Sequence, residues 1–371
     1  MLKNIPFYLI FPLFILYNIG LLFELFSPIQ IGYYSLIYPI VAILLFKFPK
    51  NNRFKIFKTD FLFSVYIFFS IIMYAINSPF TNTEKVLYYL QIIVIQIIIY
   101  LSIRQFNFSE KNIKIFKILF WIITISLVSK LKGSLFIYFD ESKGMSTYQG
   151  LSRCLVLTSL IIIYSLKNRI KFLYFLVTVF ILFILGSRSE FALFLIGIFV
   201  VFILNKKRTL TKLVSIVISI ILLISLYNPK TVNSLNDTSR IFSIINFQSV
   251  YKNEGRGSLN DNSIKNISEN IFFGDFNNVD IGGSAHNILS AWEINGVLFF
   301  LLTLGISFIN FILRLIDFRN STSNFHTKIA FFYSTLWFVG MFTSYWYGNE
   351  MFAVALSTSA NLEVFKSRPH E

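Results

Sequence analysis

The sequence predicts an all-α, polytopic integral membrane protein with about twelve transmembrane helices and one large loop outside the membrane. Two observations predict this class. Hydrophobic residues make up 55% of the 371 residues, and the mean hydropathy of +0.67 lies far above the usual range of soluble proteins. The apolar residues also gather in long runs, which are separated by short basic segments and by one long polar stretch. A soluble globular fold is therefore excluded.

The apolar runs define the predicted helices, because a bilayer core requires about 20 consecutive apolar residues in a helix. Twelve runs meet or approach this length: 5–26, 31–48, 60–77, 86–103, 115–137, 150–166, 172–185, 191–204, 213–227, 287–313, 329–346 and 350–365. The seventh, eighth and ninth runs are short for a full span, and Asn361 and Glu363 interrupt the twelfth. The first run follows Lys3, as a signal peptide would, but it ends without a small-residue cleavage site, so we expect an uncleaved span.

The distribution of positive charge predicts the orientation in the membrane. The net charge is +15, and 22 of the 33 lysines and arginines fall at the two termini and in alternate short loops between runs. Loops rich in Lys and Arg stay in the cytoplasm, so both termini are expected there. The same distribution accounts for the basic composition without a nucleic-acid partner.

The long polar stretch divides the chain into three parts: helices one to nine in 1–227, an outward-facing loop in 228–286, and helices ten to twelve with a short cytoplasmic tail in 287–371. Loops this long without secondary structure are uncommon unless they are functional or disordered. This loop holds six acidic residues and five cations, so it is not a polybasic surface for anionic lipid. We therefore expect the chemistry of the protein in this loop.

Four outward-facing arginines are candidate binding residues. Arg188 follows Gly186 and Ser187 in a turn between two short runs, Arg240 and Arg256 belong to the long loop, and Arg153 flanks another outward turn. A guanidinium can bind phosphate or carboxylate with two parallel hydrogen bonds. The alternative for Arg188 is contact with lipid phosphates or an ion pair with Glu190, and Arg240 and Arg256 could equally be solvated loop residues.

His286 is the only outward-facing histidine in this topology, and it stands where the loop becomes a helix. Asn287 follows it, and Glu293 is expected two turns deeper on the same helical face. Because a carboxylate in a span is costly, Glu293 should face protein or water. The pair could form a base with its electrostatic support, or a polar helix start in which Glu293 pairs with a neighbouring helix.

Taken together, these motifs resemble the superfamily of O-antigen polymerases and O-antigen ligases. The resemblance rests on Gly-Ser-Arg at 186–188, the long loop with spaced arginines, His-Asn at 286–287 and Glu-x-x-Gly at 293–296. It covers roughly 170–310 by motif and the whole chain by topology. The family often has an Asn-Pro-x-x-Gly-x-Gly-like element before the histidine, of which 270–276 keeps the Asn and the first Gly.

The resemblance implies a metal-independent glycosyltransferase of the bacterial inner membrane, without a cofactor. Its donor would be an oligosaccharide on undecaprenyl diphosphate, exposed at the periplasmic face, where the long loop would lie. Arg188, Arg240 and Arg256 would stabilise the leaving diphosphate, and His286 with Glu293 would activate the acceptor hydroxyl. Expected partners besides membrane lipid are a chain-length regulator and a flippase.

The polymerase, which joins repeat units, is the interpretation that we favour for the function, because the Phe-, Ile-, Lys- and Asn-rich composition is typical of enzymes from polysaccharide gene clusters. A ligase that transfers the glycan to lipid A core is the alternative within the family. A flippase for lipid-linked oligosaccharides is the alternative from another class. The large outer loop and the lack of two-fold sequence repetition argue against a transporter.

Overall fold

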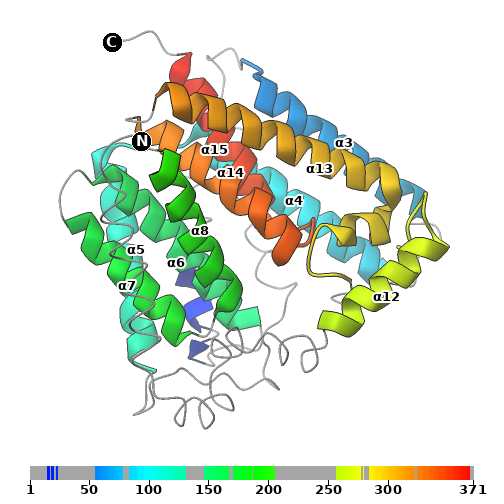
Figure 1. Cartoon of the computed structure of the whole chain (residues 1–371), viewed down its shortest axis with the longest axis horizontal. Coiled ribbons are helices and arrows are strands. Elements are labelled where there is room, and N and C mark those ends of the chain that lie inside the picture. Colours follow the sequence, from blue (N-terminus) through cyan, green and yellow to red (C-terminus); the bar gives the residue numbers. More distant parts are fainter. Residues whose placement is uncertain are drawn as a thin grey trace. The chain divides into compact units, whose positions relative to one another are not determined.

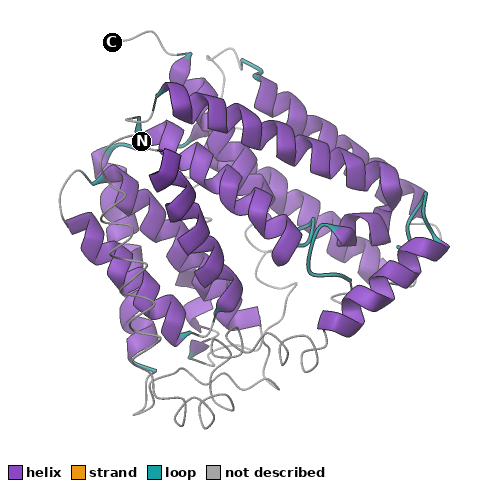
Figure 2. Ribbon diagram, in the orientation of Figure 1, coloured by secondary structure: helices purple, strands orange, loops and turns teal. Residues whose placement is uncertain are grey.

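Every secondary-structure element that the computed structural model describes is an α-helix (Figures 1 and 2). The described residues are 15–16, 18–20, 22–23, 55–77, 83–130, 146–166, 170–185, 187–204, 256–276, 279, 284–321 and 324–367. The helices are α3 (Lys58–Asn77), α4 (Thr83–Gln105), α5 (Glu110–Val128), α6 (Ser146–Ser165), α7 (Ile170–Ile184), α8 (Arg188–Leu204), α12 (Arg256–Glu269), α13 (Leu289–Asn320), α14 (Phe325–Thr343) and α15 (Glu350–Lys366). The all-α class is confirmed for this part of the chain.

Several helices have the composition of membrane spans. The helices long and apolar enough to cross a bilayer are Lys58–Asn77, Lys85–Gln105 and Leu289–Asn320, and the shorter apolar ones are Gly150–Ser165, Ile170–Ile184 and Ser189–Val200. These coincide with six of the predicted spans. The first, second and ninth predicted spans lie wholly or mostly outside the described residues. The described part of the chain is thus all-helical and consistent with a membrane protein, while the number of twelve spans and their orientation remain predictions.

The chain forms two compact units. The first unit contains α3, α4 and α12 to α15, and the second contains α5 to α8. Within the first unit α15 packs against α3, α4 and α14, and α13 packs against α3 and α14. Within the second unit α6 packs against α5, α7 and α8.

The helix α15 forms the centre of the first unit, which explains its weak signal as a membrane span. Every residue from Met351 to Leu362 is buried. Asn361, which interrupts the apolar run, donates hydrogen bonds from its Nδ2 to the carbonyls of Ile103, Arg104 and Phe106 over 2.8–3.1 Å. Because the carbonyls at a helix end have no partner within the helix, this amide caps the end of α4. The polar residues of α15 are satisfied by protein, so the helix needs no lipid-facing surface.

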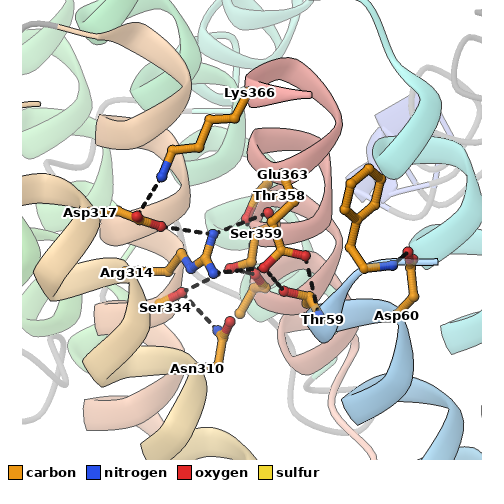
Figure 3. Close-up of polar contacts among 12 residues, drawn as sticks. Thr59, Asp60, Asn310, Arg314, Asp317, Ser334, Thr358, Ser359, Glu363 and Lys366 are labelled. Carbon is orange, nitrogen blue, oxygen red and sulfur yellow. Dashed lines mark hydrogen bonds and ion pairs between the residues drawn. The ribbon is translucent and has the colours of Figure 1, made fainter. Parts of the chain in front are cut away.

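Buried ion pairs join the helices of the first unit at one end, and Figure 3 shows those of Arg314. Arg104 binds Asp60 with two hydrogen bonds, Nε to Oδ1 at 2.6 Å and Nη2 to Oδ2 at 2.9 Å. Arg314 contacts Glu363 at 2.9 Å and Asp317 at 3.0 Å. Arg104 and Arg314 lie beyond the ends of the predicted spans 86–103 and 287–313, but both are buried residues of helices. Their charges are tolerated there because each faces a carboxylate.

Candidate functional site

The helix α13 is broken at Gly296, and this break positions the candidate site. Gly296 has φ +81° and ψ 174°, which is not a helical conformation. In a regular helix the N–H of Val297 would donate to the carbonyl of Glu293. Here Val297 donates to the carbonyl of Ile271 at 3.0 Å, and the carbonyl of Glu293 accepts from the N–H of Asp275 at 2.6 Å. One hydrogen bond within α13 is therefore replaced by two hydrogen bonds between α13 and the turn after α12.

Two glycines make this exchange sterically feasible. A Cβ at Gly296 would lie 1.9 Å from the carbonyl oxygen of Phe272, and a Cβ at Gly274 (φ +72°) would lie 2.5 Å from the backbone carbon of Ile294. Both glycines also adopt a positive φ, which side chains with a Cβ rarely tolerate. The structure thus gives a physical reason for the Gly of Glu-x-x-Gly and for the single Gly kept in 270–276.

The carboxylate of Glu293 accepts three hydrogen bonds from the surrounding protein. Its exposed fraction is 1%. Oε2 accepts hydrogen bonds from the Ser263 hydroxyl at 2.6 Å and the Ala285 N–H at 3.1 Å, and Oε1 accepts from the Asn266 amide at 3.0 Å. The donors stabilise a charge that would otherwise be costly to bury. The expectation that Glu293 faces protein is confirmed, and its partners are α12 and the segment before α13, which lies beside α12 (Figure 1).

His286 lies in a bend three residues before α13 begins at Leu289, and it is exposed. The expectation that His286 and Glu293 share a helical face is wrong, because the helix starts after the histidine. Their connection is instead the hydrogen bond from the neighbouring Ala285 to Glu293. Asn287 stabilises the start of α13, since its Oδ1 accepts from the N–H of Leu289 at 2.9 Å. His286 is therefore held by its neighbours at the surface of the first unit.

The turn between α14 and α15 supports the same segment from the other side. Ile288 donates to the carbonyl of Met341 at 2.6 Å, and the N–H of Tyr347 donates to the Ser290 hydroxyl at 3.2 Å. The phenol of Tyr347 shares a 2.9 Å hydrogen bond with Tyr74 of α3. Burial raises the pKa of Tyr347 well above its ordinary value, so the phenol stays neutral. The backbone that follows His286 is thus bound by α14 and by the turn after it.

The second unit holds two of the candidate arginines. Arg188 is the first residue of α8, and its side chain lies outside the described atoms. Glu190, which has an exposed fraction of 4%, accepts from the Ser187 hydroxyl at 2.6 Å and contacts Arg153 Nε at 3.4 Å. Arg153 is therefore engaged in an ion pair that stabilises the start of α8. The alternative pairing of Glu190 with Arg188 lies outside the described side chains.

The segment 228–286, predicted as a loop, contains a helix that its apolar pattern does not predict. This is α12, and Arg256 is its first residue. The side chain of Arg256 and all of Arg240 lie outside the described residues. Sequence reasoning also missed Ser263 and Asn266, whose spacing of three residues places both on one helical face.

One further polar residue of the first unit was missed. Lys85, in the first turn of α4, is buried, and its Nζ lies 5.6 Å from the ring centre of Phe276. Phe276 belongs to the turn that binds the break in α13, so Lys85 is a cation close to the candidate site. As for metals, no group of three or more His, Cys, Asp or Glu side chains that could hold an ion occurs within the described ranges.

A family model described as O-antigen ligase matches residues 173–275. No curated protein matches the chain. The matched segment runs from α7 through Arg188, Arg240 and Arg256 to Asp275. It stops before His286 and Glu293, whose place in the site rests on the geometry described above. The match supports the resemblance: over residues 173–275 the chain is similar to the O-antigen ligase family.

Proposed function

We propose that the protein is an O-antigen polymerase, which joins oligosaccharide repeat units carried on undecaprenyl diphosphate at the periplasmic face of the inner membrane. The observation that supports this most is the family match over 173–275, which contains the three candidate diphosphate-binding arginines. Members of this family are glycosyltransferase-like enzymes, so the match favours an enzyme over a flippase. The all-helical membrane fold is consistent with a lipid-linked donor.

The proposed reaction transfers the growing glycan from its diphosphate carrier to a sugar hydroxyl on a second lipid-linked repeat. The bond between the anomeric carbon and the diphosphate oxygen breaks, and the acceptor oxygen forms the new glycosidic bond. Arg188, Arg240 and Arg256 would stabilise the negative charge that develops on the leaving diphosphate, in place of a metal ion. Guanidinium groups suit this task because they present two donors in a fixed geometry.

His286 would accept the proton of the acceptor hydroxyl. A neutral imidazole, with an ordinary pKa near ~6.5, suits this role near neutral pH. Exposure leaves the ring accessible to a substrate, while the hydrogen bonds of Ala285, Ile288 and Ser290 fix its backbone. Glu293 is unsuited to contact substrate in this arrangement, because both of its oxygens accept hydrogen bonds from the protein.

A purified-protein assay tests the role of His286. The donor and acceptor are lipid-linked repeat units extracted from a strain that lacks the gene. His286→Ala should lower chain extension by about 10²–10⁴-fold, with normal protein accumulation. The activity of the parent should fall as the pH drops below the histidine pKa, because the protonated imidazole accepts no proton. Asn287 already stabilises the helix start, so a His286→Asn variant with near-normal activity would remove His286 from the catalytic residues.

The arginines are tested in the same assay. Arg188→Lys and Arg256→Lys should weaken activity, because an ammonium cannot reproduce the two-donor geometry, and the Ala variants should abolish it. We expect Arg240 to tolerate substitution better. Lys265→Ala is the matched control for Arg256, since Lys265 is an exposed cation of the same helix. Full polymer from both arginine-to-alanine variants would show that these arginines do not bind the diphosphate.

A ligase is the second candidate, because the matching family model is described as O-antigen ligase. The two activities differ in their acceptor, which is a lipid-linked repeat for the polymerase and lipid A core for the ligase. A surface-polysaccharide gel of a deletion strain separates them. Core that carries a single repeat unit indicates a lost polymerase, and core without any repeat indicates a lost ligase. A chain-length regulator and a flippase are the partners that the polymerase would require.

A further inference from the structure

We propose that Ser263 and Asn266 are positioning residues, which act through Glu293 to fix the helix α12 against the segment that carries His286. This inference rests on the proposed function and extends it to residues outside the family motifs. The two side chains donate to opposite oxygens of Glu293, at 2.6 Å and 3.0 Å. The N–H of Ala285 donates to the same carboxylate at 3.1 Å.

The carboxylate joins two segments of the first unit. Ser263 and Asn266 belong to α12, whereas Ala285 directly precedes His286. A charged acceptor makes stronger hydrogen bonds than a neutral one, and its burial removes competition from water. The exposed fraction of Glu293 is 1%, so the three donors take the place of water around its oxygens. Glu293 therefore acts as a positioning residue rather than as a base.

The consequence for the reaction follows from the direction of α12. Arg256, the proposed diphosphate ligand, is the first residue of this helix, seven residues before Ser263. A helix rises about 1.5 Å per residue, so Arg256 lies about 10 Å along the helix axis from Ser263. An anchor at Ser263 therefore also holds the end of α12 that carries Arg256. The same carboxylate holds the backbone next to His286. One buried group thus sets the distance between the residue that binds the donor and the residue that activates the acceptor.

Two readouts separate positioning from a purely structural role. Loss of the anchor should loosen α12, which hydrogen–deuterium exchange of the 256–269 peptide reports without any substrate. It should also raise the KM for the lipid-linked donor, because Arg256 is no longer held in place. The pH midpoint of kcat should not move, since His286 and its exposure are unchanged. A change confined to protein abundance would indicate a structural role alone.

The variants are made in the full-length protein in lipid nanodiscs. Ser263→Ala and Asn266→Ala should each speed exchange in α12 and raise the donor KM about tenfold. Ser263→Thr keeps the hydroxyl and should restore both values. Ser268→Ala is the matched control, because Ser268 is exposed on the same helix and its hydroxyl binds the carbonyl of Lys265 at 2.7 Å. It should leave both values unchanged.

The results distinguish this inference from the proposed function. Unchanged exchange in Ser263→Ala and Asn266→Ala would overturn the anchor itself, whatever the enzyme does. Faster exchange with an unchanged donor KM would overturn the positioning role. An active His286→Ala variant would contradict the proposed catalytic role but leaves the exchange result readable. The same acceleration in Ser268→Ala would show that any substitution on α12 loosens it, and would also overturn the proposal.

Discussion

Gly296→Ala is the sharpest test of how the break in α13 is built. The new methyl group would lie 1.9 Å from the carbonyl oxygen of Phe272, and alanine would have to adopt φ +81° and ψ 174°. That backbone conformation alone costs about 1–3 kcal/mol for a residue other than glycine. The clash also separates the turn from α13, so that the bonds from Val297 and Asp275 are lost. Each is worth about 0.5–1.5 kcal/mol, which gives a total loss of about 2–6 kcal/mol.

The measurement is the free energy of unfolding in mixed micelles, obtained by titration with sodium dodecyl sulfate. Gly305→Ala is the matched control, because Gly305 lies in the same helix and a Cβ there would meet no atom within 4 Å. Alanine should stabilise that position by up to about 1 kcal/mol, through its higher helix propensity. The two substitutions add the same methyl group to one helix and should have opposite signs.

Equal stability of the Gly296→Ala and Gly305→Ala proteins would refute the reasoning. It would mean that α13 continues through residue 296 as a regular helix and that the turn after α12 docks elsewhere. Hydrogen exchange of the 270–276 peptide gives an independent check. The Gly296→Ala variant should exchange faster there, whereas the Gly305→Ala variant should match the parent.

The remaining predictions concern the ion pairs and the orientation of the chain. Arg104→Ala should lower the free energy of unfolding by about 3–5 kcal/mol, because Asp60 would stay buried without its counter-ion. Arg104→Lys should fall between the parent and Arg104→Ala, and a fully stable Arg104→Ala protein in the same titration would contradict the pairing. Reporter fusions at Asn205 and Asn320 should read cytoplasmic, as the cation distribution predicts. A fusion at Asn260 should read periplasmic, and a cytoplasmic signal there would remove the proposed access to the donor.

The sequence predicted the apolar helices well and the polar one not at all. The runs of apolar residues identify α3, α4 and α13 because lipid and core both demand apolar surfaces. A search for apolar runs does not find α12, because few of its 14 residues are apolar and its buried anchoring residue is Ser263. The end of α13 was placed at 313 but lies at Asn320. Arg314 looks like a loop residue in sequence, but its ion pairs with Asp317 and Glu363 allow its charge to be buried within the helix.

The sequence predicted the environment of Glu293 but not the geometry around it. The cost of a carboxylate in a span correctly indicated that Glu293 faces protein. Its donors could not be foreseen, because Ser263 lies 30 residues away and hydrogen bonds between distant segments leave no periodic pattern. The helix α13 begins two residues later than the predicted span at 287, so His286 does not share a helical face with Glu293. Helix ends depend on local hydrogen bonds such as that of Asn287, which hydropathy does not measure.

The central place of α15 has a consequence for the order of synthesis. Thr59 of α3 and Glu363 of α15 are 304 residues apart, yet they are joined by two hydrogen bonds. At about 5–20 residues per second, the ribosome needs roughly 10–50 s to pass from the end of α4 to the start of α15. During that time α5 to α8, which belong to the second unit, are made. Until the last helix is made, Thr59 of α3 lacks its partner Glu363, and the end of α4 lacks the amide of Asn361 that caps it.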